Sequence, residues 1–174
     1  MTFLARYLTH PQVKIDPALP VPSWELSALG RARTEALAKS GCLSGTTQII
    51  SSGERKAIET AEIIAQKLNV AVEVREAMHE NDRSATGFLP ADEFDAAANE
   101  FFAKPLVAVK GWERAIDAQV RIVHEVEHVL AIEQAMCSSS AMVRSALFYF
   151  VTMQVLPLIE YMTNPVGAVT ALRS

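Results

Sequence analysis

The segment that most constrains the fold of this chain runs from residue 46 to residue 68. Its first part, Thr46 to Ile50, predicts a short buried strand. The next four residues, Ser51-Ser52-Gly53-Glu54, match the S-x-x-E capping pattern with which helices begin, and the helical pattern continues to about Leu68. A strand that turns directly into a helix is the repeating unit of α/β proteins, so we expect that fold class.

The same alternation of strands and helices continues on both sides of this unit. Phe3 to Thr9 predicts a strand with His10 at its exit, because Pro11 keeps the preceding residue extended. The remaining expected elements are a helix capped by Ser27 that ends near Ser40, a strand over Val70 to Val74, a helix over Pro90 to Phe102, a long helix from Gly111 to about Glu133, and an extended proline-containing loop from Ile15 to Trp24. This order predicts a three-layer α/β/α sandwich around a mostly parallel sheet.

Length and charge exclude several other classes of protein. The 174 residues suit one α/β domain, which we expect to span residues 1–174. The net charge of -4 and the absence of a basic run argue against a nucleic-acid partner. The beginning of the chain does not have the pattern of a signal peptide, and two isolated cysteines form no disulfide framework, so we expect a cytoplasmic protein. Leu147 to Met162 is too short and too interrupted to span a membrane, so we expect no membrane partner.

Three residues are placed where the chemistry of an α/β protein usually occurs. In open α/β sheets the reactive groups gather past the carboxyl ends of the strands, and His10 and Arg55 both fall there. A neutral imidazole can attack phosphorus, and a guanidinium at the start of a helix can hold phosphate oxygens. Glu80 follows the third expected strand and can protonate a leaving oxygen if its pKa is raised. Each residue also has an ordinary interpretation, as a turn histidine, a solvated helix arginine and a loop carboxylate.

The segment Ser51 to Ala61, SSGERKAIETA, resembles the S-S-x-x-x-R-A-x-x-T-A segment of the histidine phosphatases, the phosphoglycerate mutase-like superfamily. In that family the arginine of the segment grips the transferred phosphate, and we assign this role to Arg55. The resemblance also implies that His10 is the nucleophile and Glu80 the acid, and we expect Asn81 and Arg83 to help bind the substrate. Two further segments resemble the family: LSALG at 26–30 is similar to L-T-x-x-G, and GWE at 111–113 is similar to G-G-E. The whole resemblance covers about residues 2–133.

The chain departs from the family pattern in two places. The family begins its site with R-H-G, whereas His10 here follows Thr9, so that one arginine is missing and either Arg83 or Arg6 is expected to compensate. The family also has a second histidine, in S-H-G, after a later buried strand, but no histidine follows His128 in this chain. We therefore expect the loss of the second histidine to impair turnover.

The residues from about Ala135 onward have the properties of a shifted reading frame. If each codon is read from its third base, Met142 into Val143 must encode glycine, and the codon that straddles Ala141 and Met142 permits histidine. The same frame permits Asp-Val-Leu-Val-Val-Gly-His-Gly-Ala-Val-Gly-Thr-Leu-Leu, which contains a buried strand and the missing His-Gly. We interpret the tail as translated out of frame, and the alternative is a naturally divergent tail.

Several other functions compete with the phosphatase interpretation. His124-Glu125-Val126-Glu127-His128 matches the H-E-x-x-H signature of zinc proteases. However, a helical wheel with Trp112, Ile116, Val120, Val123 and Leu130 as the apolar stripe puts both histidines on the polar side, so we expect neither a metal nor a cofactor. The segment from Cys137 to Arg144 only faintly resembles the loop of cysteine phosphatases, with six intervening residues instead of five.

The most favoured function is phosphoryl transfer through a phosphohistidine at His10, on a small phosphorylated metabolite or phosphate ester. We favour a hydrolase over a mutase, because the chain is short and has no obvious insertion that would grip a phosphoglycerate. The alternative outside the enzymes is a degenerate phosphatase fold that binds a phosphorylated ligand without turning it over.

Overall fold

The computed structural model of the chain describes residues 4–138, 145–149 and 169–172. In this part of the chain one parallel sheet has the strand order β3-β2-β4-β1-β5. Its strands are β1 (Leu4–Leu8), β2 (Thr46–Ser51), β3 (Val72–Val74), β4 (Ser145–Tyr149) and β5 (Val169–Leu172). The α-helices are α1 (Ala28–Lys39), α2 (Arg55–Leu68), α3 (Ala91–Ala103) and α4 (Ala115–Ser138). The predicted three-layer α/β/α sandwich is confirmed.

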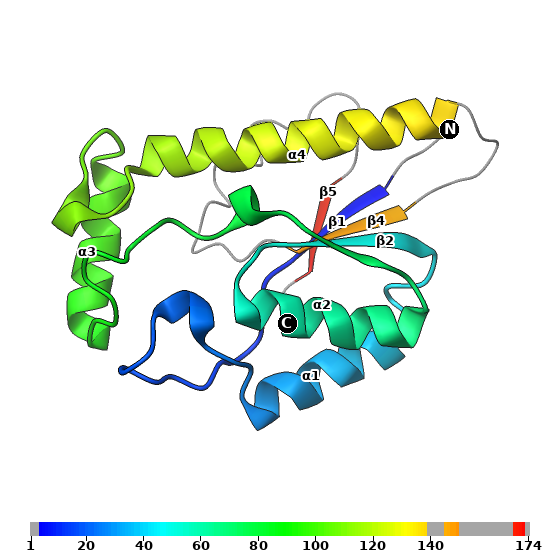
Figure 1. Ribbon diagram of the computed structural model, residues 1–174, viewed down its shortest axis with the longest axis horizontal. Helices are drawn as coiled ribbons and strands as arrows, with labels where there is room; N and C mark the ends of the chain where they lie inside the picture. The colour runs from blue at the N-terminus through cyan, green and yellow to red at the C-terminus, as the bar shows by residue number, and fades with distance from the viewer. Residues whose placement is uncertain (1–3, 139–144, 150–168, 173–174) are drawn as a thin grey trace.

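Helices cover the sheet on both faces, with α1 and α2 on one side and α4 on the other (Figure 1). Successive residues of a strand point to opposite faces, so a strand buried on both sides is apolar without alternation. Ile49 and Ile50 in β2 show this directly, since neither is exposed. Ile49 packs in the core formed with α1 and α2, whereas Ile50 packs with Ile122 and Val129 of α4.

The beginning of α1 follows the prediction, but the beginning of α2 has a different cause. Ser27 caps α1, because its hydroxyl oxygen accepts the backbone N–H of Gly30 at 3.1 Å. Glu54 is the residue before α2, but neither it nor Ser51 makes a side-chain capping bond there. The carboxylate of Glu54 instead faces inward, 3.5 Å from the ammonium of Lys56. Ser51 and Glu54 therefore do not form the predicted capping box, although α2 begins where it was expected.

Helix α4 begins later than predicted, at Ala115 rather than at Gly111. Gly111 ends a short 3-10 helix, with a left-handed φ of 80°, and Trp112 packs beside α3. Trp112 lies outside α4, so a helical wheel that includes it rotates the apolar stripe away from the buried face of the helix. The buried face carries Ile122, whereas Val120 from the predicted stripe is 61% exposed.

The loop from Ile15 to Trp24 is held in a defined shape rather than simply extended. It contains a 3-10 helix over Val21–Ser23, and the buried indole of Trp24 donates to the carbonyl oxygens of Asp16 at 2.9 Å and Leu19 at 3.3 Å. These bonds tie the two ends of the loop together and hold its prolines in a defined arrangement.

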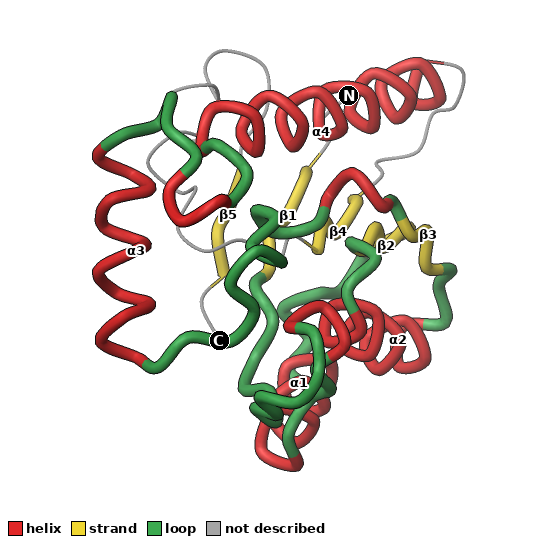
Figure 2. Tube along the Cα trace, turned by 60° about the vertical axis from the view of Figure 1, so that its left-hand side comes forward, coloured by secondary structure: helices red, strands yellow, loops and turns green. Residues whose placement is uncertain are grey.

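Helix α3 stands to one side of the sheet rather than on either of its faces (Figure 2). Its buried residues Ala97 and Phe101 pack with Val109 and Trp112, in a small core that precedes α4. None of the helices in the described part of the chain has the length and apolar character needed to cross a bilayer. Most of the segments Cys137–Arg144 and Leu147–Met162 lies outside the described residues.

Candidate active site

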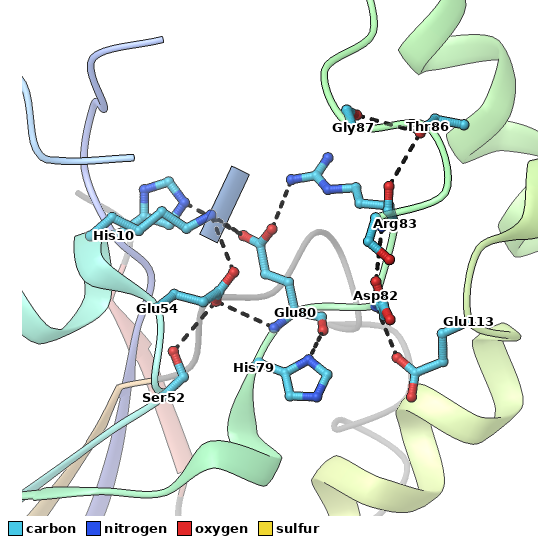
Figure 3. A network of polar contacts seen from close by, with 12 residues as sticks. His10, Ser52, Glu54, His79, Glu80, Asp82, Arg83, Thr86, Gly87 and Glu113 are labelled. Atoms are coloured by element: carbon cyan, nitrogen blue, oxygen red, sulfur yellow. Dashed lines mark hydrogen bonds and ion pairs between the residues drawn. The ribbon is translucent and has the colours of Figure 1, made fainter. Parts of the chain in front are cut away.

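The side chains predicted to carry the chemistry come from three segments that end at one edge of the sheet. His10 lies two residues past β1, Ser51 and Ser52 join β2 to α2, and Glu80 follows the turn after β3. Parallel strands bring their carboxyl ends to the same edge, and reactive groups of α/β proteins gather there. The sheet topology therefore explains why residues 70 positions apart meet, as the close-up of the site shows (Figure 3).

The position of His10 is set by a close contact between the chain that follows it and the start of α1. The carbonyl oxygen of Gln12 accepts the backbone N–H of Ser27 at 3.0 Å and its hydroxyl at 3.1 Å. Gly30 makes this approach possible, because a Cβ at that position would lie 2.2 Å from the same oxygen. The small residue after LSAL in the sequence therefore fixes the segment that carries His10.

The hydrogen bond of His10 with its own neighbour selects the tautomer of the imidazole. Nδ1 lies 2.7 Å from the carbonyl oxygen of Pro11, and a carbonyl oxygen only accepts, so Nδ1 carries the proton. The other ring nitrogen, Nε2, lies 3.6 Å from Oε1 of Glu80, and it faces that carboxylate with a proton when the ring is charged and with a lone pair when the ring is neutral. The side chain remains 23% exposed. This is the arrangement that a histidine nucleophile needs, because its reactive nitrogen faces the site and its other nitrogen is occupied.

The cation of the site is Lys56, a residue that we did not single out in the sequence. Its side chain is 2% exposed, and its ammonium nitrogen lies 3.3 Å from Oε1 of Glu80 and 3.5 Å from Oε1 of Glu54. On the other side, the guanidinium of Arg83 lies 2.8 Å from Oε2 of Glu80. Glu80 is thus contacted by a histidine, a lysine and an arginine, and Figure 3 shows His10 and Arg83 on either side of its carboxylate. Paired charges of this kind are what allows ionisable groups to be buried.

Arg55, to which we assigned the phosphate, points away from the site. Its side chain is 51% exposed and forms ion pairs with Glu25 at 2.7 Å and Glu59 at 3.0 Å. Consecutive residues of a helix point about 100° apart, so Arg55 and Lys56 do not face the same side. In the family motif three residues separate the second serine from the arginine. Counted from Ser52, the position of that arginine is occupied by Lys56, so the spacing already indicated this residue. The assignment of Arg55 was therefore wrong by one position.

Of the two arginines expected to compensate for Thr9, the structure brings only Arg83 to the site. Arg6 lies in the middle of β1, and its guanidinium is 3.5 Å from the hydroxyl oxygen of Thr46, the first residue of β2. It is therefore near the opposite end of β2 from the site. Arg83 lies beside Glu80, and its guanidinium carbon Cζ lies 5.0 Å from the centroid of the Phe94 ring, which also helps to position it.

The charges around the two buried glutamates shift their pKa values in opposite directions. Burial, the largest single influence, raises the pKa of Glu80, but the hydrogen bond with His10 and the charges of Lys56 and Arg83 together lower it to about 2. The pKa of Glu54 is raised, first by burial and then by the negative charge of Glu80. In the free protein, Glu80 therefore does not meet the condition of a raised pKa that we attached to its role as general acid. It is ionised because cations surround it.

Two residues of the G-W-E segment and α4 hold the loop that carries Glu80. Arg121 donates from Nη1 to the carbonyl oxygens of Ala77 at 2.7 Å and His79 at 3.0 Å, and from Nη2 to the carboxylate of Glu113 at 2.7 Å. The backbone N–H of Glu113 donates to the carbonyl oxygen of Asp82 at 2.8 Å, and the backbone N–H of Asp82 donates to the carboxylate of Glu113 at 3.1 Å. The carbonyl acceptors of Arg121 belong to a loop about 40 residues earlier in the chain, so no local pattern in the sequence indicates them.

A cavity of about 750 Å³ opens beside Glu54, Glu80 and Arg83. Asn81 also lines it, and the buried Nδ2 of its amide makes no hydrogen bond within the described part of the chain. A buried amide donor is costly when it has no acceptor, so this group is suited to an oxygen of a bound ligand. Asn81 and Arg83, both expected to bind substrate, therefore lie together at the wall of the cavity.

The histidines of the H-E-x-x-H segment do not line this cavity. The side chain of His124 is 77% exposed, and Nδ1 of His128 lies 3.2 Å from the guanidinium of Arg75. A guanidinium at that distance repels a metal cation. Among the described residues no group of three or more histidine, cysteine, aspartate or glutamate side chains is arranged to hold a metal ion.

Comparison with known proteins identifies the fold and the family. The family model of the histidine phosphatase superfamily (branch 1) matches residues 21–173, a range that includes the tail we had set apart. A mycobacterial glucosyl-3-phosphoglycerate phosphatase in complex with inorganic phosphate is 23% identical, with a TM-score of 0.64 over 84% of this chain and 70% of that one. A structure described as mycobacterial hydrolase 1 is 21% identical, with a TM-score of 0.68 over 94% of this chain and 81% of that one.

These structural likenesses establish the fold, and no curated protein sequence matches the chain significantly. The family model, by contrast, covers most of the chain, including α1, α2 and the segments that carry Lys56 and Glu80. The chain therefore belongs to branch 1 of the histidine phosphatase superfamily and is a phosphatase of that class.

Proposed function

We propose that this chain hydrolyses phosphate monoesters of small molecules in two steps, through a phosphohistidine on His10. The observation that supports this most is the meeting of three groups at one edge of the sheet. Nε2 of His10 lies 3.6 Å, and the buried ammonium of Lys56 3.3 Å, from the same carboxylate oxygen of Glu80. A nucleophile, a cation and a proton carrier are the groups that a phosphoryl transfer requires.

In the first step Nε2 of His10 attacks phosphorus and the bond to the ester oxygen breaks. Negative charge then spreads over the phosphoryl oxygens, and donors fixed beforehand around them lower the barrier. Lys56 and Arg83 supply two cations, and the amide of Asn81 supplies a donor. Arg83 thereby takes the place of the arginine that the family has at the position of Thr9.

Glu80 acquires its proton from the substrate in this scheme. Near pH 6 a phosphate monoester exists partly as a monoanion, because its second pKa is about 6. When the phosphate binds between Lys56 and Arg83, it competes with Glu80 for both cations and adds negative charge beside it, and both effects raise the pKa of Glu80. The proton of the monoanion then moves to Glu80, which passes it to the leaving alcohol.

In the second step a water molecule attacks the phosphohistidine, and Glu80, now ionised again, takes a proton from the water. The N–P bond breaks, neutral His10 is restored, and Glu80 returns its proton to the departing phosphate, so that one alcohol and one dihydrogen phosphate monoanion are released for each water consumed. Because the proton enters with the substrate, we expect kcat/KM to fall as the pH rises above the second pKa of the ester. A mutase would instead return the phosphoryl group to the substrate.

The test is hydrolysis of phenyl phosphate, with a rapid quench to detect a phosphorylated protein. The proposal requires phosphate release together with a phosphoprotein that is stable in alkali and labile in acid, as phosphohistidine is. Both signals must disappear in His10→Ala and persist in His124→Gln, whose histidine is 77% exposed and does not line the cavity.

The second candidate is a protein that binds a phosphorylated ligand without turnover. It is favoured by Thr9 in place of an arginine and by a lysine whose charge is already shared by Glu54 and Glu80. Binding of inorganic phosphate without phosphate release or phosphoprotein in the wild type would establish this candidate and overturn the hydrolase.

A further inference from the structure

The cavity beside Glu80 has one wall that the phosphate chemistry does not use. We call residues 17–22 the proline-rich strap, and all of its members line the cavity: Pro17, Ala18, Leu19, Pro20, Val21 and Pro22. Leu19 remains 45% exposed there, and Phe88 on the facing loop is 36% exposed. Large apolar side chains left open at the mouth of a polar site are typical of a binding surface.

This apolar wall is held in place before any ligand arrives. The indole nitrogen of Trp24 donates to the carbonyl oxygens of Asp16 and Leu19, at 2.9 and 3.3 Å, and fixes the base of the strap. The ring of Trp24 also packs against Phe88, with 6.0 Å between the ring centroids and an angle of 53° between the planes. A preformed apolar surface binds its ligand with less loss of conformational freedom than a flexible one.

The charges in the cavity disfavour a second anionic group on the ligand. Its lining includes the carboxyl groups of four acidic residues, Glu54, Glu76, Glu80 and Asp82. Among the described residues that line the cavity, Arg83 is the only lysine or arginine. Its guanidinium lies 2.8 Å from Oε2 of Glu80. A carboxylate or second phosphate on the alcohol part of a substrate would therefore meet the carboxyl groups of Glu76 and Asp82 and no additional lysine or arginine among these lining residues.

We propose that this cavity holds the alcohol part of the substrate, and that the substrates are phosphate monoesters of uncharged, apolar alcohols, such as aryl or branched alkyl esters. The phosphate end of this assignment rests on the proposed function at His10. The apolar end lies against Leu19 and Phe88. Esters whose alcohol carries a carboxylate, such as 3-phosphoglycerate, are the class that the acidic lining excludes.

Binding of two phosphonates that cannot be hydrolysed tests the selectivity without requiring turnover. The probes are 1-naphthylmethylphosphonate and the phosphonate analogue of 3-phosphoglycerate, with the dissociation constants measured by calorimetry on the full chain. Burial of an aryl group against Leu19 and Phe88 should make the naphthyl compound bind at least about tenfold more tightly. Equal binding, or tighter binding of the carboxylate compound, overturns the proposal.

A pair of variants on the same loop locates the effect. Leu19→Asp places a charge on the apolar wall, whereas Ile15→Asp places it at a residue that is 59% exposed and does not line the cavity. We expect Leu19→Asp to weaken the naphthyl phosphonate about tenfold or more and to leave inorganic phosphate unaffected, while Ile15→Asp changes neither. Equal losses in both variants would mean that the strap does not contact the ligand.

The failures of this inference and of the proposed function are distinguishable. If the naphthyl phosphonate binds selectively but phenyl phosphate is not hydrolysed, the hydrolase fails and the apolar subsite stands. If phenyl phosphate is hydrolysed but 3-phosphoglycerate has the higher kcat/KM, the hydrolase stands and the apolar subsite fails.

Discussion

The ammonium of Lys56 lies 3.3 Å from the carboxylate of Glu80, and both side chains are almost completely buried. Lysine carries its charge at one point, whereas the guanidinium of arginine is a broad planar fork. A single point charge can lie between two carboxylates, and Lys56 also lies 3.5 Å from Glu54. The lysine at this place of the family motif is therefore accompanied by a buried acid that shares its charge.

Removal of the Lys56 charge should damage catalysis far more than removal of the Arg55 charge. We expect Lys56→Gln to lower kcat/KM for phenyl phosphate by about 10²–10³, the usual effect of losing a donor to the transition state. Arg55→Gln should remain close to the wild type, because its ion pairs are at the surface and contribute little. Steady-state kinetics on both variants, with circular dichroism to check folding, measure this. A large loss in Arg55→Gln would restore the assignment that the structure rejected.

The pH dependence of stability should reveal the ionised state of Glu80. Its pKa is lowered from 4.5 to about 2 in the folded protein, so the stability it contributes is complete above pH 4.5 and is lost as the pH falls toward 2. The size of this contribution is about 3 kcal/mol. Urea unfolding at several pH values should therefore show the wild type losing its advantage over Glu80→Gln as the pH falls from about 5 toward 2. A constant difference between the two proteins across that range would contradict the prediction.

Glu54 should show the opposite dependence in the same experiment. Its pKa is raised, so the folded protein binds this proton more tightly than the unfolded chain does, and the contribution is complete below pH 4.5 and lost as the pH rises through the folded pKa. Glu54→Gln has no proton to lose, and its stability relative to the wild type should increase toward neutral pH. A relative stability that decreases with rising pH would mean that Glu54 is ionised in the folded protein.

Loss of Arg121 should affect the chemical step through the position of Glu80. Arg121 donates to the carbonyl oxygens of Ala77 and His79, and we expect Arg121→Gln to lower kcat by about 10², with little change in KM or in the affinity for inorganic phosphate. The control is Arg114→Gln, whose side chain is 48% exposed and pairs with Asp117 at the surface. Equal changes in KM and kcat would indicate a general loss of structure rather than a displaced acid loop.

The reading-frame hypothesis makes a prediction for residues outside the described part of the chain. A protein whose residues from about Ala135 are replaced by the third-base translation regains a histidine at the codon that straddles Ala141 and Met142. With a further donor for the phosphoryl group, kcat for phenyl phosphate should rise by about 10². Resequencing of the gene provides the independent check. An intact frame without a histidine codon at that position contradicts the hypothesis.

The sequence predicted the elements well wherever the pattern was local. Ser27 caps α1, and the short segment Thr46 to Ile50 forms β2 almost as predicted, because capping and strand burial depend on neighbouring residues. The prediction failed where the outcome depended on contacts between distant segments. Trp112 belongs to the core of α3, not to α4, and the phase of the predicted helical stripe was therefore wrong.

By itself, the sequence determined the α/β class, the family, and the two residues His10 and Glu80 at the edge of the sheet, because alternating patterns and motif spacing are written along the chain. Only the tertiary structure decided that Lys56, rather than its neighbour Arg55, faces Glu80. A helix turns successive side chains through about 100°, so packing against the sheet selects one residue for the site and leaves the next one in solvent. Burial and the charges that meet there then lower the pKa of Glu80 and raise that of Glu54.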